Sequence, residues 1–357
     1  MYLRQLKAEN FRLLRTLDLQ PDQRLNLFLG ANAAGKTSLL EAVYTLARGK
    51  SFRGGTAAEL AGPAGRRWLL FGRVLAGDGA RAHHLGLRWA DGSSEIRVDG
   101  RAATSLSLLQ SLPVQILEPG THRMLQDGPA YRRSFLDWGV FHVEPSFMAV
   151  WQRYRRALRQ RNQALRTRGG ERELAAWEPE LANAGEALDR LRRTHLERLA
   201  PAVDAQVSAL LGEGEWRFEL HPGWMRGTPL REALARQRAA DRRLGTTQQG
   251  PHRAELRLRA GGHAVKHRIS RGQQKLLIGA LVLAQSEEIG RVTGAHPVLL
   301  IDDFGAELAE RYQSALLSAL RRYPGQLFMT AFERSGALAQ ELPGRVFHVE
   351  QGALREL

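Results

Sequence analysis

The alternation of apolar and polar positions predicts a chain that is rich in strands at both ends and helical in its middle. Two short runs are almost wholly apolar: Leu25–Leu29, in which Asn26 is the single polar residue, and Val298–Ile301. Such runs are typical of short strands buried on both faces of a sheet. Residues 68–98 instead show the period-two alternation that is typical of antiparallel strands. Further strands are expected at Met1–Ala8, Trp68–Leu75, Leu85–Trp89, Glu95–Val98 and Leu112–Leu117.

The segment from 121 to 248 has helical periodicity and many polar residues. Apolar side chains recur at helical spacing through Phe147–Arg166, and again in a long segment after Gly169-Gly170 that Pro201 is expected to interrupt. Two antiparallel helices of this kind would form a short arm inserted between the two halves of an α/β domain. The predicted organisation is an N-terminal half at 1–120, an inserted α-helical arm domain at 121–248 and a C-terminal half at 249–357.

A glycine-rich segment joins the first buried strand to an apolar helix. It fits the phosphate-binding P-loop pattern, in which Lys36 would contact the β- and γ-phosphates and the Thr37 hydroxyl would bind Mg²⁺. A glycine-rich turn that merely precedes a helix is the alternative, but the flanking strand and helix favour an ATP site. The residues expected to bind the nucleotide are Gly30, Ala31, Asn32, Ala33, Ala34, Gly35, Lys36, Thr37 and Ser38.

The second buried strand ends in two carboxylates. Asp302 is the predicted Mg²⁺ ligand together with Thr37, and Asp303 is the predicted catalytic group that orients or deprotonates the attacking water. The two acids could instead cap a following helix, but the apolar run leading directly into them favours the metal site. Gln115, near the end of another predicted strand, is a second catalytic candidate that would sense Mg²⁺ and water. An ordinary sheet residue is an equally good interpretation of Gln115.

A third motif, Ser270-Arg271-Gly272-Gln273, opens an apolar helix about thirty residues before Asp302. It resembles the ABC signature Ser-Gly-Gly-Gln, with arginine in place of the first glycine. Serine suits a helix N-cap, and glycine allows an anion to approach the helix terminus closely. The resemblance implies an ABC-type P-loop ATPase head in which Ser270, Gly272 and Gln273 contact the ATP of a second chain. Two ATP molecules would then lie between the subunits of a head-to-tail homodimer.

The charge of the chain points to a polyanionic partner. The formal net charge is +15, and such an excess of basic residues usually serves nucleic-acid binding. The segment Trp151–Arg168 carries seven arginines and no acidic residue. A solvated helical face is the alternative, but such a face is normally mixed in sign. We therefore expect a DNA-contacting surface that includes Arg155, Arg156, Arg159 and Arg161.

Three absences narrow the class of protein further. The sequence contains no cysteine, which excludes disulfides and thiolate metal sites and fits the cytosol. It also shows no signal peptide and no apolar stretch of membrane-spanning length. The expectation is a cytoplasmic, nucleoid-associated protein with no membrane partner.

Together these motifs resemble those of the RecF family, bacterial recombination mediators related to the SMC group of DNA-repair ATPases. The resemblance covers essentially the full length and extends the predicted nucleotide site to Arg12. It implies a protein that works with RecR, and indirectly with RecO and RecA, at single-strand gaps in DNA and in the damage-induced SOS response. Beyond the P-loop, the signature and the paired aspartates, it is carried by Asn10-Phe11-Arg12, Leu40-Glu41-Ala42, Ser51-Phe52-Arg53, Gly128-Pro129, Arg132–Asp137, Gln160-Arg161-Asn162 and Gly250–Arg253.

Two departures from the ABC pattern bear on hydrolysis. The usual D-loop Ser-x-Leu-Asp is replaced by Ala306–Ala309, and no switch histidine follows the apolar run that ends at Met329. They favour an ATP-switched DNA-binding clamp in which slow hydrolysis resets the state. The alternative is a DNA-stimulated, SMC-like ATPase whose turnover drives DNA remodelling. The soluble ATPase subunit of a transporter would not need the basic arm.

Overall fold

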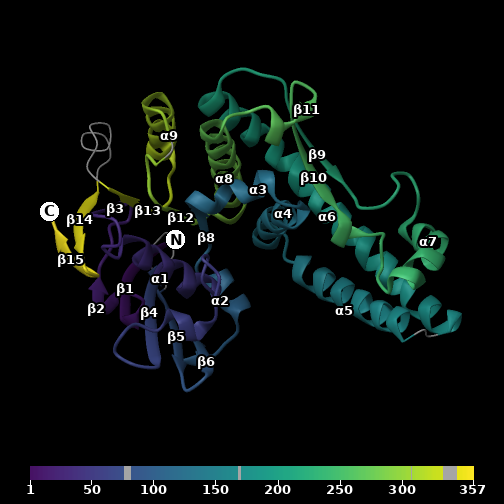
Figure 1. Ribbon diagram of the computed structural model, residues 1–357, viewed down its shortest axis with the longest axis horizontal. Helices are drawn as coiled ribbons and strands as arrows, with labels where there is room; N and C mark the ends of the chain where they lie inside the picture. The colour runs from purple at the N-terminus through teal and green to yellow at the C-terminus, as the bar shows by residue number, and fades with distance from the viewer. Residues whose placement is uncertain (76–81, 168–169, 307, 333–343) are drawn as a thin grey trace. The chain divides into compact units, whose positions relative to one another are not determined.

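The computed structural model describes residues 1–75, 82–167, 170–306, 308–332 and 344–357 (Figure 1). The chain divides into two compact units. The first comprises Met1–Thr121, Ala209–Leu211 and Arg271–Leu357, and the second comprises His122–Ser208 and Gly212–Ser270. In this division residues 249–270 belong to the second unit, although the sequence-based boundary at 248 would assign them to the ATPase half.

The first unit contains a six-stranded sheet in the order β2-β1-β4-β5-β6-β7. Its long strands β1 (Tyr2–Phe11) and β4 (Arg67–Leu75) pair antiparallel. Buried residues alternate with more exposed ones along β4, so one face of the sheet is covered. The antiparallel strands predicted from the period-two pattern are therefore confirmed. The other strands are β2 (Leu14–Leu19), β5 (Ala82–Ala90), β6 (Ser93–Val98) and β7 (Arg101–Ala102).

The second sheet of this unit has the order β15-β14-β3-β13-β12-β8. Its strands run parallel except β15, which returns antiparallel to β14. Every residue of β3 (Leu25–Leu29) and β12 (Val298–Ile301) is buried, as expected for strands covered on both faces, and their bounds match the predicted runs. The remaining strands are β8 (Val114–Leu117), β13 (Leu327–Ala331), β14 (Arg345–Glu350) and β15 (Ala353–Glu356).

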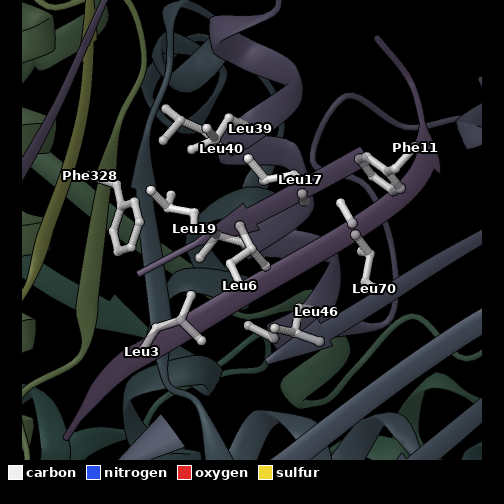
Figure 2. Packing of buried hydrophobic residues seen from close by; sticks show 14 of the residues in the cluster. Leu3, Leu6, Phe11, Leu17, Leu19, Leu39, Leu40, Leu46, Leu70 and Phe328 are labelled. Carbon is white, nitrogen blue, oxygen red and sulfur yellow. The ribbon is translucent and has the colours of Figure 1, made fainter. Parts of the chain in front are cut away.

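Helix α1 (Lys36–Arg48) lies between the two sheets and is buried on nearly all sides. Figure 2 shows Leu39 and Leu40 of α1 in the same cluster as Leu70 of β4 and Phe328 of β13. The buried positions of α1 include the polar residues Glu41 and Thr45 as well as the leucines. The first turn of α1 is therefore fixed by both sheets.

The opposite face of the mixed sheet is covered by α8 (Arg271–Thr293) and α9 (Glu310–Arg322). A Cβ atom built on Gly279 of α8 would lie 3.9 Å from Leu117 of β8 and 3.5 Å from Leu316 of α9. Ile116 of β8 instead packs in the cluster around α1. Successive side chains of a strand point to opposite faces. Leu117 therefore lies on the face of β8 that α8 covers, and Ile116 lies on the face that α1 covers. The unit also contains η1 (Ala57–Leu60) and α2 (Ser105–Ser111).

The second unit is mainly helical. Tyr154, Leu181, Leu188 and Leu230 share its largest apolar cluster. The principal helices of this unit are α4 (Pro129–Val143), α5 (Phe147–Arg166), α6 (Glu171–Leu211) and α7 (Leu230–Leu244). Helix α5 has the predicted bounds.

The expected interruption at Pro201 is wrong, because α6 continues through it to Leu211. Proline removes one backbone hydrogen bond from a helix interior. Pro201 itself is exposed, whereas Leu199 and Val203 next to it are buried. We infer that the packing of this apolar side holds the helix together where the hydrogen bond is lost.

A small antiparallel sheet in the second unit was not predicted from the sequence. It consists of β9 (Trp216–His221), β10 (Glu255–Ala260) and β11 (His263–Ala264).

Among the helices of the described residues, none combines the length and the apolar composition needed to cross a membrane. The remaining short helices are η2 (Pro119–His122), α3 (Arg123–Gln126), η3 (Pro251–Arg253) and η4 (Val265–His267).

Candidate nucleotide-binding site

The P-loop connects β3 to α1, as its sequence predicts. Gly35 occupies the N-cap of α1 with φ 110°, a left-handed conformation that side chains rarely adopt. A Cβ atom on Gly30 would lie only 2.3 Å from the carbonyl oxygen of Val349. Both glycines are therefore required by the backbone, and the loop ends with the N–H groups of a helix terminus available to an anion.

Lys36 is the cation of this loop. Its side chain is 8% exposed, and its Nζ donates hydrogen bonds to the carbonyl oxygens of Gly30 at 2.6 Å and Ala31 at 2.9 Å. Burial lowers the pKa of Lys36, and the nearby carboxylates of Asp302 and Asp303 act in the opposite direction. The ammonium group is thus held across the loop by two of its carbonyl oxygens.

Asp302 directly follows β12, and its carboxylate accepts hydrogen bonds from both the P-loop helix α1 and the neighbouring strand β13. The Thr37 hydroxyl lies 3.1 Å from both carboxylate oxygens of Asp302 and donates to them. The Thr330 hydroxyl, at the end of β13, donates to Asp302 Oδ1 at 2.7 Å and accepts a bond from the Asp303 N–H at 2.8 Å. Burial is the main cause that raises the pKa of Asp302, while the bonds from Thr330 and Thr37 oppose it.

These side chains border a cleft of about 500 Å³. Asp303 has φ 55°, so the chain turns sharply out of β12 at the cleft wall. Thr37 and Asp302 are adjacent oxygen donors, a set that fits Mg²⁺, which usually takes one or two protein oxygens beside waters and phosphates. In the described part of the chain no three His, Cys, Asp or Glu side chains form a metal-binding group. Of the predicted nucleotide contacts, the cleft is lined by Asn32, Ala33, Ala34, Gly35, Lys36, Thr37 and Ser38.

Gln115 does not belong to this cleft. Its Nε2 donates to Gln285 of α8 at 2.7 Å, and both side chains are buried. Gln115 shares the α8 side of β8 with Leu117, whereas the cleft opens on the α1 side. This geometry contradicts the predicted catalytic role, and the alternative of an ordinary sheet residue describes Gln115 correctly.

Arg12 is also placed differently from the prediction. Its guanidinium donates to both carboxylate oxygens of Glu41 at 2.8 and 3.0 Å and to the carbonyl oxygen of Glu59 at 2.8 Å. Glu41 is fully buried in α1 and also accepts a bond from Ser51. Because its nitrogens are directed to these partners, Arg12 secures the segments around the P-loop helix and does not line the cleft.

Three polar residues of the cleft lining, Arg53, Glu118 and Thr330, were not among the predicted site residues. Arg53 lies 3.9 Å from Glu41 Oε2, and its charge lowers the pKa of Asp302 against the larger effect of burial. Thr330 and Glu118 also line the cleft, at the ends of β13 and β8. The Asp302 N–H donates to the Leu117 carbonyl at 2.8 Å, which sets Glu118 beside Asp302 in the parallel ladder. Thr330 and Glu118 could have been predicted from the sequence, because each lies at the carboxyl end of a predicted apolar run. The carboxyl ends of parallel strands meet at one edge of a sheet.

The signature segment lies at the start of α8. Ser270 immediately precedes the helix, which begins at Arg271, and Gly272 and Gln273 are half-buried in the first turn. Lys275 in the second turn donates to the carbonyl oxygen of Ala306 at 2.9 Å. This bond connects the signature helix to the segment that follows Asp303. Glu307 of the predicted D-loop lies outside the described residues.

The arginines of α5 fall into two groups. Arg155, Arg156 and Arg159 are exposed, and the Arg155 guanidinium stacks over Trp151 at 4.9 Å from the ring centre. Arg153 is exposed as well, but it forms an ion pair with Glu180 of α6. Three of the four arginines predicted to contact DNA are therefore exposed.

Arg161 is the exception, because its side chain is completely buried. Its guanidinium contacts Asp241 of α7 at 2.7 Å, Glu178 of α6 at 3.2 Å and the Thr247 hydroxyl at 2.8 Å. Burial would raise the pKa of Glu178, but the hydrogen bonds and charges of Arg238 and Arg161 outweigh it and lower that pKa. Arg161 joins three segments of the second unit and cannot reach DNA, so this part of the prediction is wrong.

The fold and the cleft define an ABC-type P-loop ATPase head, and comparisons with known proteins agree. Residues 2–355 match the family described as RecF/RecN/SMC N terminal domain. The DNA replication and repair protein RecF of Thioalkalivibrio sulfidiphilus is 40% identical over 357 residues, with 99% of each chain covered. That of Chromohalobacter salexigens is 41% identical over 361 residues, again with 99% of each covered. A solved structure of the recombination mediator protein RecF with ATP, from the RecFOR pathway, has a TM-score of 0.87 at 26% identity and covers 100% of this chain and 97% of that one. The chain belongs to the RecF family of DNA replication and repair proteins.

Proposed function

We propose that the protein is an ATP-dependent, DNA-binding recombination mediator that acts in DNA repair and replication. The observation that carries the proposal is the meeting of Lys36, Thr37 and Asp302 in one cleft at the carboxyl edge of the parallel sheet. This set supplies a cation for phosphates and oxygen donors for Mg²⁺. A related RecF structure with ATP supports the same ligand for this chain.

In this proposal each cleft residue has a separate task. Mg²⁺, when bound, neutralises charge on the β- and γ-phosphates, and Thr37 and Asp302 would hold it. Lys36 and the P-loop N–H groups bind the phosphates, and Asp303 accepts a proton from the attacking water. Thr330 fixes the Asp302 carboxylate and the Asp303 backbone through its two hydrogen bonds.

Asp303→Asn is expected to slow ATP hydrolysis at least about tenfold, because the amide cannot accept the proton of the attacking water. ATP binding should stay within about twofold of the wild type, since phosphate contacts come from the P-loop. ATP-dependent dimers should persist or live longer. Phosphate release measures hydrolysis, calorimetric titration measures ATP binding, and light scattering measures the dimers. Hydrolysis at the wild-type rate would show that another group of the cleft activates the water. Glu118, which lies beside Asp302 on the adjacent strand, would be the next candidate.

The nucleotide is proposed to act as the switch for dimer formation. Ser270, Gly272 and Gln273 begin a helix whose first N–H groups can bind an anion, and in an ABC-type head they would complete the partner's ATP site. Hydrolysis would then release the subunits and reset the clamp.

Complementation between two variants tests this arrangement. A Ser270→Arg chain should bind ATP but not dimerise, because a bulky cation fills the space for the partner's γ-phosphate. A Lys36→Ala chain should fail because it lacks ATP. A mixture of the two contains one intact composite site and should regain partial dimerisation by light scattering. Absence of rescue, with both variants folded by circular dichroism, would count against the sandwich dimer.

The exposed face of α5 is proposed to contact DNA phosphates through Arg155, Arg156 and Arg159. Neutralising one phosphate contributes about 0.9 to the slope of log affinity against log salt on duplex DNA. The triple alanine variant should therefore bind all DNA sequences more weakly and reduce that slope by up to about 2.7. Arg153→Ala is the matched control, since its guanidinium is already paired with Glu180. Salt titrations by fluorescence anisotropy measure both. An unchanged slope would indicate that this face binds a protein partner.

The partners proposed for the chain follow from its family. Related RecF structures come from the RecFOR pathway, which supports RecR as a direct partner and RecO and RecA as indirect ones. We place the protein at single-strand gaps in DNA, where it would help to load RecA in the damage-induced SOS response. This role assigns it to the nucleoid in the cytoplasm.

A DNA-stimulated, SMC-like ATPase is the second candidate, favoured by the intact Asp302–Asp303 pair beside Thr37. The two functions differ in whether turnover is needed. A non-hydrolysable ATP analogue should support DNA binding as fully as ATP if the protein is a switch. If the analogue fails and ATP succeeds, turnover performs the work.

A further inference from the structure

The turn of the C-terminal hairpin lies directly against the P-loop. Between β14 and β15 the chain reverses through Gln351 at φ 48° and Gly352 at φ 81°. Two successive left-handed residues are typical of a tight type I′ hairpin turn. The Gly352 N–H donates to the carbonyl oxygen of Ala34 in the P-loop at 2.8 Å.

The hairpin and the loop pack backbone to backbone, without intervening side chains. A Cβ atom on Gly35 would lie 3.1 Å from the Cα atom of Gly352. A Cβ atom on Gly352 would lie 2.1 Å from the carbonyl oxygen of Leu13. Side-chain atoms cannot be added at Gly352 without moving the backbone of one neighbour.

The hydrogen bond to Ala34 also sets the direction of the adjoining N–H. In a trans peptide the carbonyl and the N–H of one unit point in opposite directions. The carbonyl of the Ala34–Gly35 peptide points to the hairpin, so the Gly35 N–H points away from it. Ala34 and Gly35 both line the cleft, where such an N–H can donate to a phosphate oxygen.

We propose that Gly352 is a positioning residue of the nucleotide site, which holds the Ala34–Gly35 peptide in the orientation that binds phosphate. The inference rests on the proposed ATP-binding function. It assigns to the last strands of the chain a direct influence on nucleotide affinity, although none of their residues lines the cleft.

Gly352→Ala and Gly92→Ala form a matched pair for the test. Gly92 follows Asp91 in another tight turn, with φ 80° and 52° respectively, and has no other heavy atom within 4 Å of its would-be Cβ. Gly352→Ala should weaken MgATP binding at least about tenfold, because the displaced Gly35 N–H would lose its hydrogen bond to a charged phosphate oxygen, and such a bond is worth about tenfold or more in affinity. Gly92→Ala should bind like the wild type in calorimetric titrations. Equal affinity for both variants would overturn the inference.

Hydrogen exchange on the wild-type protein covers the case in which Gly352→Ala does not fold. MgATP should slow exchange in peptides from 345–357 and leave those from 82–98 unchanged. Equal exchange in 345–357 with and without nucleotide, while calorimetry shows binding, would refute the positioning role alone. If the wild type and Gly92→Ala both fail to bind MgATP, the proposed ATP-binding function itself is refuted.

Discussion

Lys36→Ala is expected to lower the affinity for ATP by about a thousandfold. Hydrogen bonds to charged groups contribute about 1.5–3 kcal/mol each, and Lys36 would donate to both the β- and the γ-phosphate. About 1.4 kcal/mol corresponds to a factor of ten in affinity, so two such bonds give this magnitude. Dimer formation should be lost with ATP binding. Calorimetry or a fluorescent ATP analogue measures the first effect, and light scattering the second.

Lys50→Ala is the control for the loss of one positive charge. Lys50 is exposed and lies outside the nucleotide cleft, so its replacement should leave ATP affinity unchanged. Lys36→Arg should recover only part of the affinity, because a planar fork cannot replace a compact ammonium in the narrow loop. Wild-type affinity in Lys36→Ala would refute the P-loop assignment.

Arg161→Ala is expected to destabilise the second unit by about 3–5 kcal/mol, since it removes one partner from buried ion pairs. Glu178 would keep Arg238 as a partner. Asp241, which is fully buried, would lose its ion pair and keep only its bond from the Gln248 N–H. Urea unfolding followed by circular dichroism measures the loss.

Arg159→Ala provides the comparison within the same helix. Arg159 is exposed and should change stability by less than about 0.5 kcal/mol, as surface substitutions usually do. The two substitutions should therefore separate the functions of neighbouring arginines. Arg159→Ala would affect DNA binding, and Arg161→Ala would affect folding. A loss below about 1 kcal/mol for Arg161→Ala, the range of exposed pairs, would contradict the buried network.

The elements that the sequence predicted best have a single period throughout. Strands β3 and β12 are buried at every position and apolar at all but Asn26, and α5 keeps one apolar face, so their bounds were recovered. Strand β10 was missed because its arginines alternate with leucines in a short, basic segment. Pro201 was misread because the burial of the neighbouring leucine and valine side chains depends on tertiary packing, which no local pattern contains.

The candidate site shows the same limit. The P-loop and Asp302 were predicted because each follows directly from a buried strand. The sequence could not decide between the two interpretations of Gln115, since the face of its strand that carries the P-loop helix is known only once the sheet is ordered. Arg161 was assigned to DNA because its segment contains no acid, whereas its acidic partners come from α6 and α7.

The order of strands in the mixed sheet sets the time at which the nucleotide site can form during synthesis. Strand β3 lies between β13 and β14, and Leu27 pairs with Met329 near the other end of the chain. At about 5–20 residues per second the P-loop strand leaves the ribosome on the order of 15–60 s before its neighbours. Contacts between such distant segments also slow folding. The P-loop strand therefore lacks both of its neighbours in the sheet until residues 327–350 have been synthesised, and the nucleotide cleft cannot take its observed form before that time.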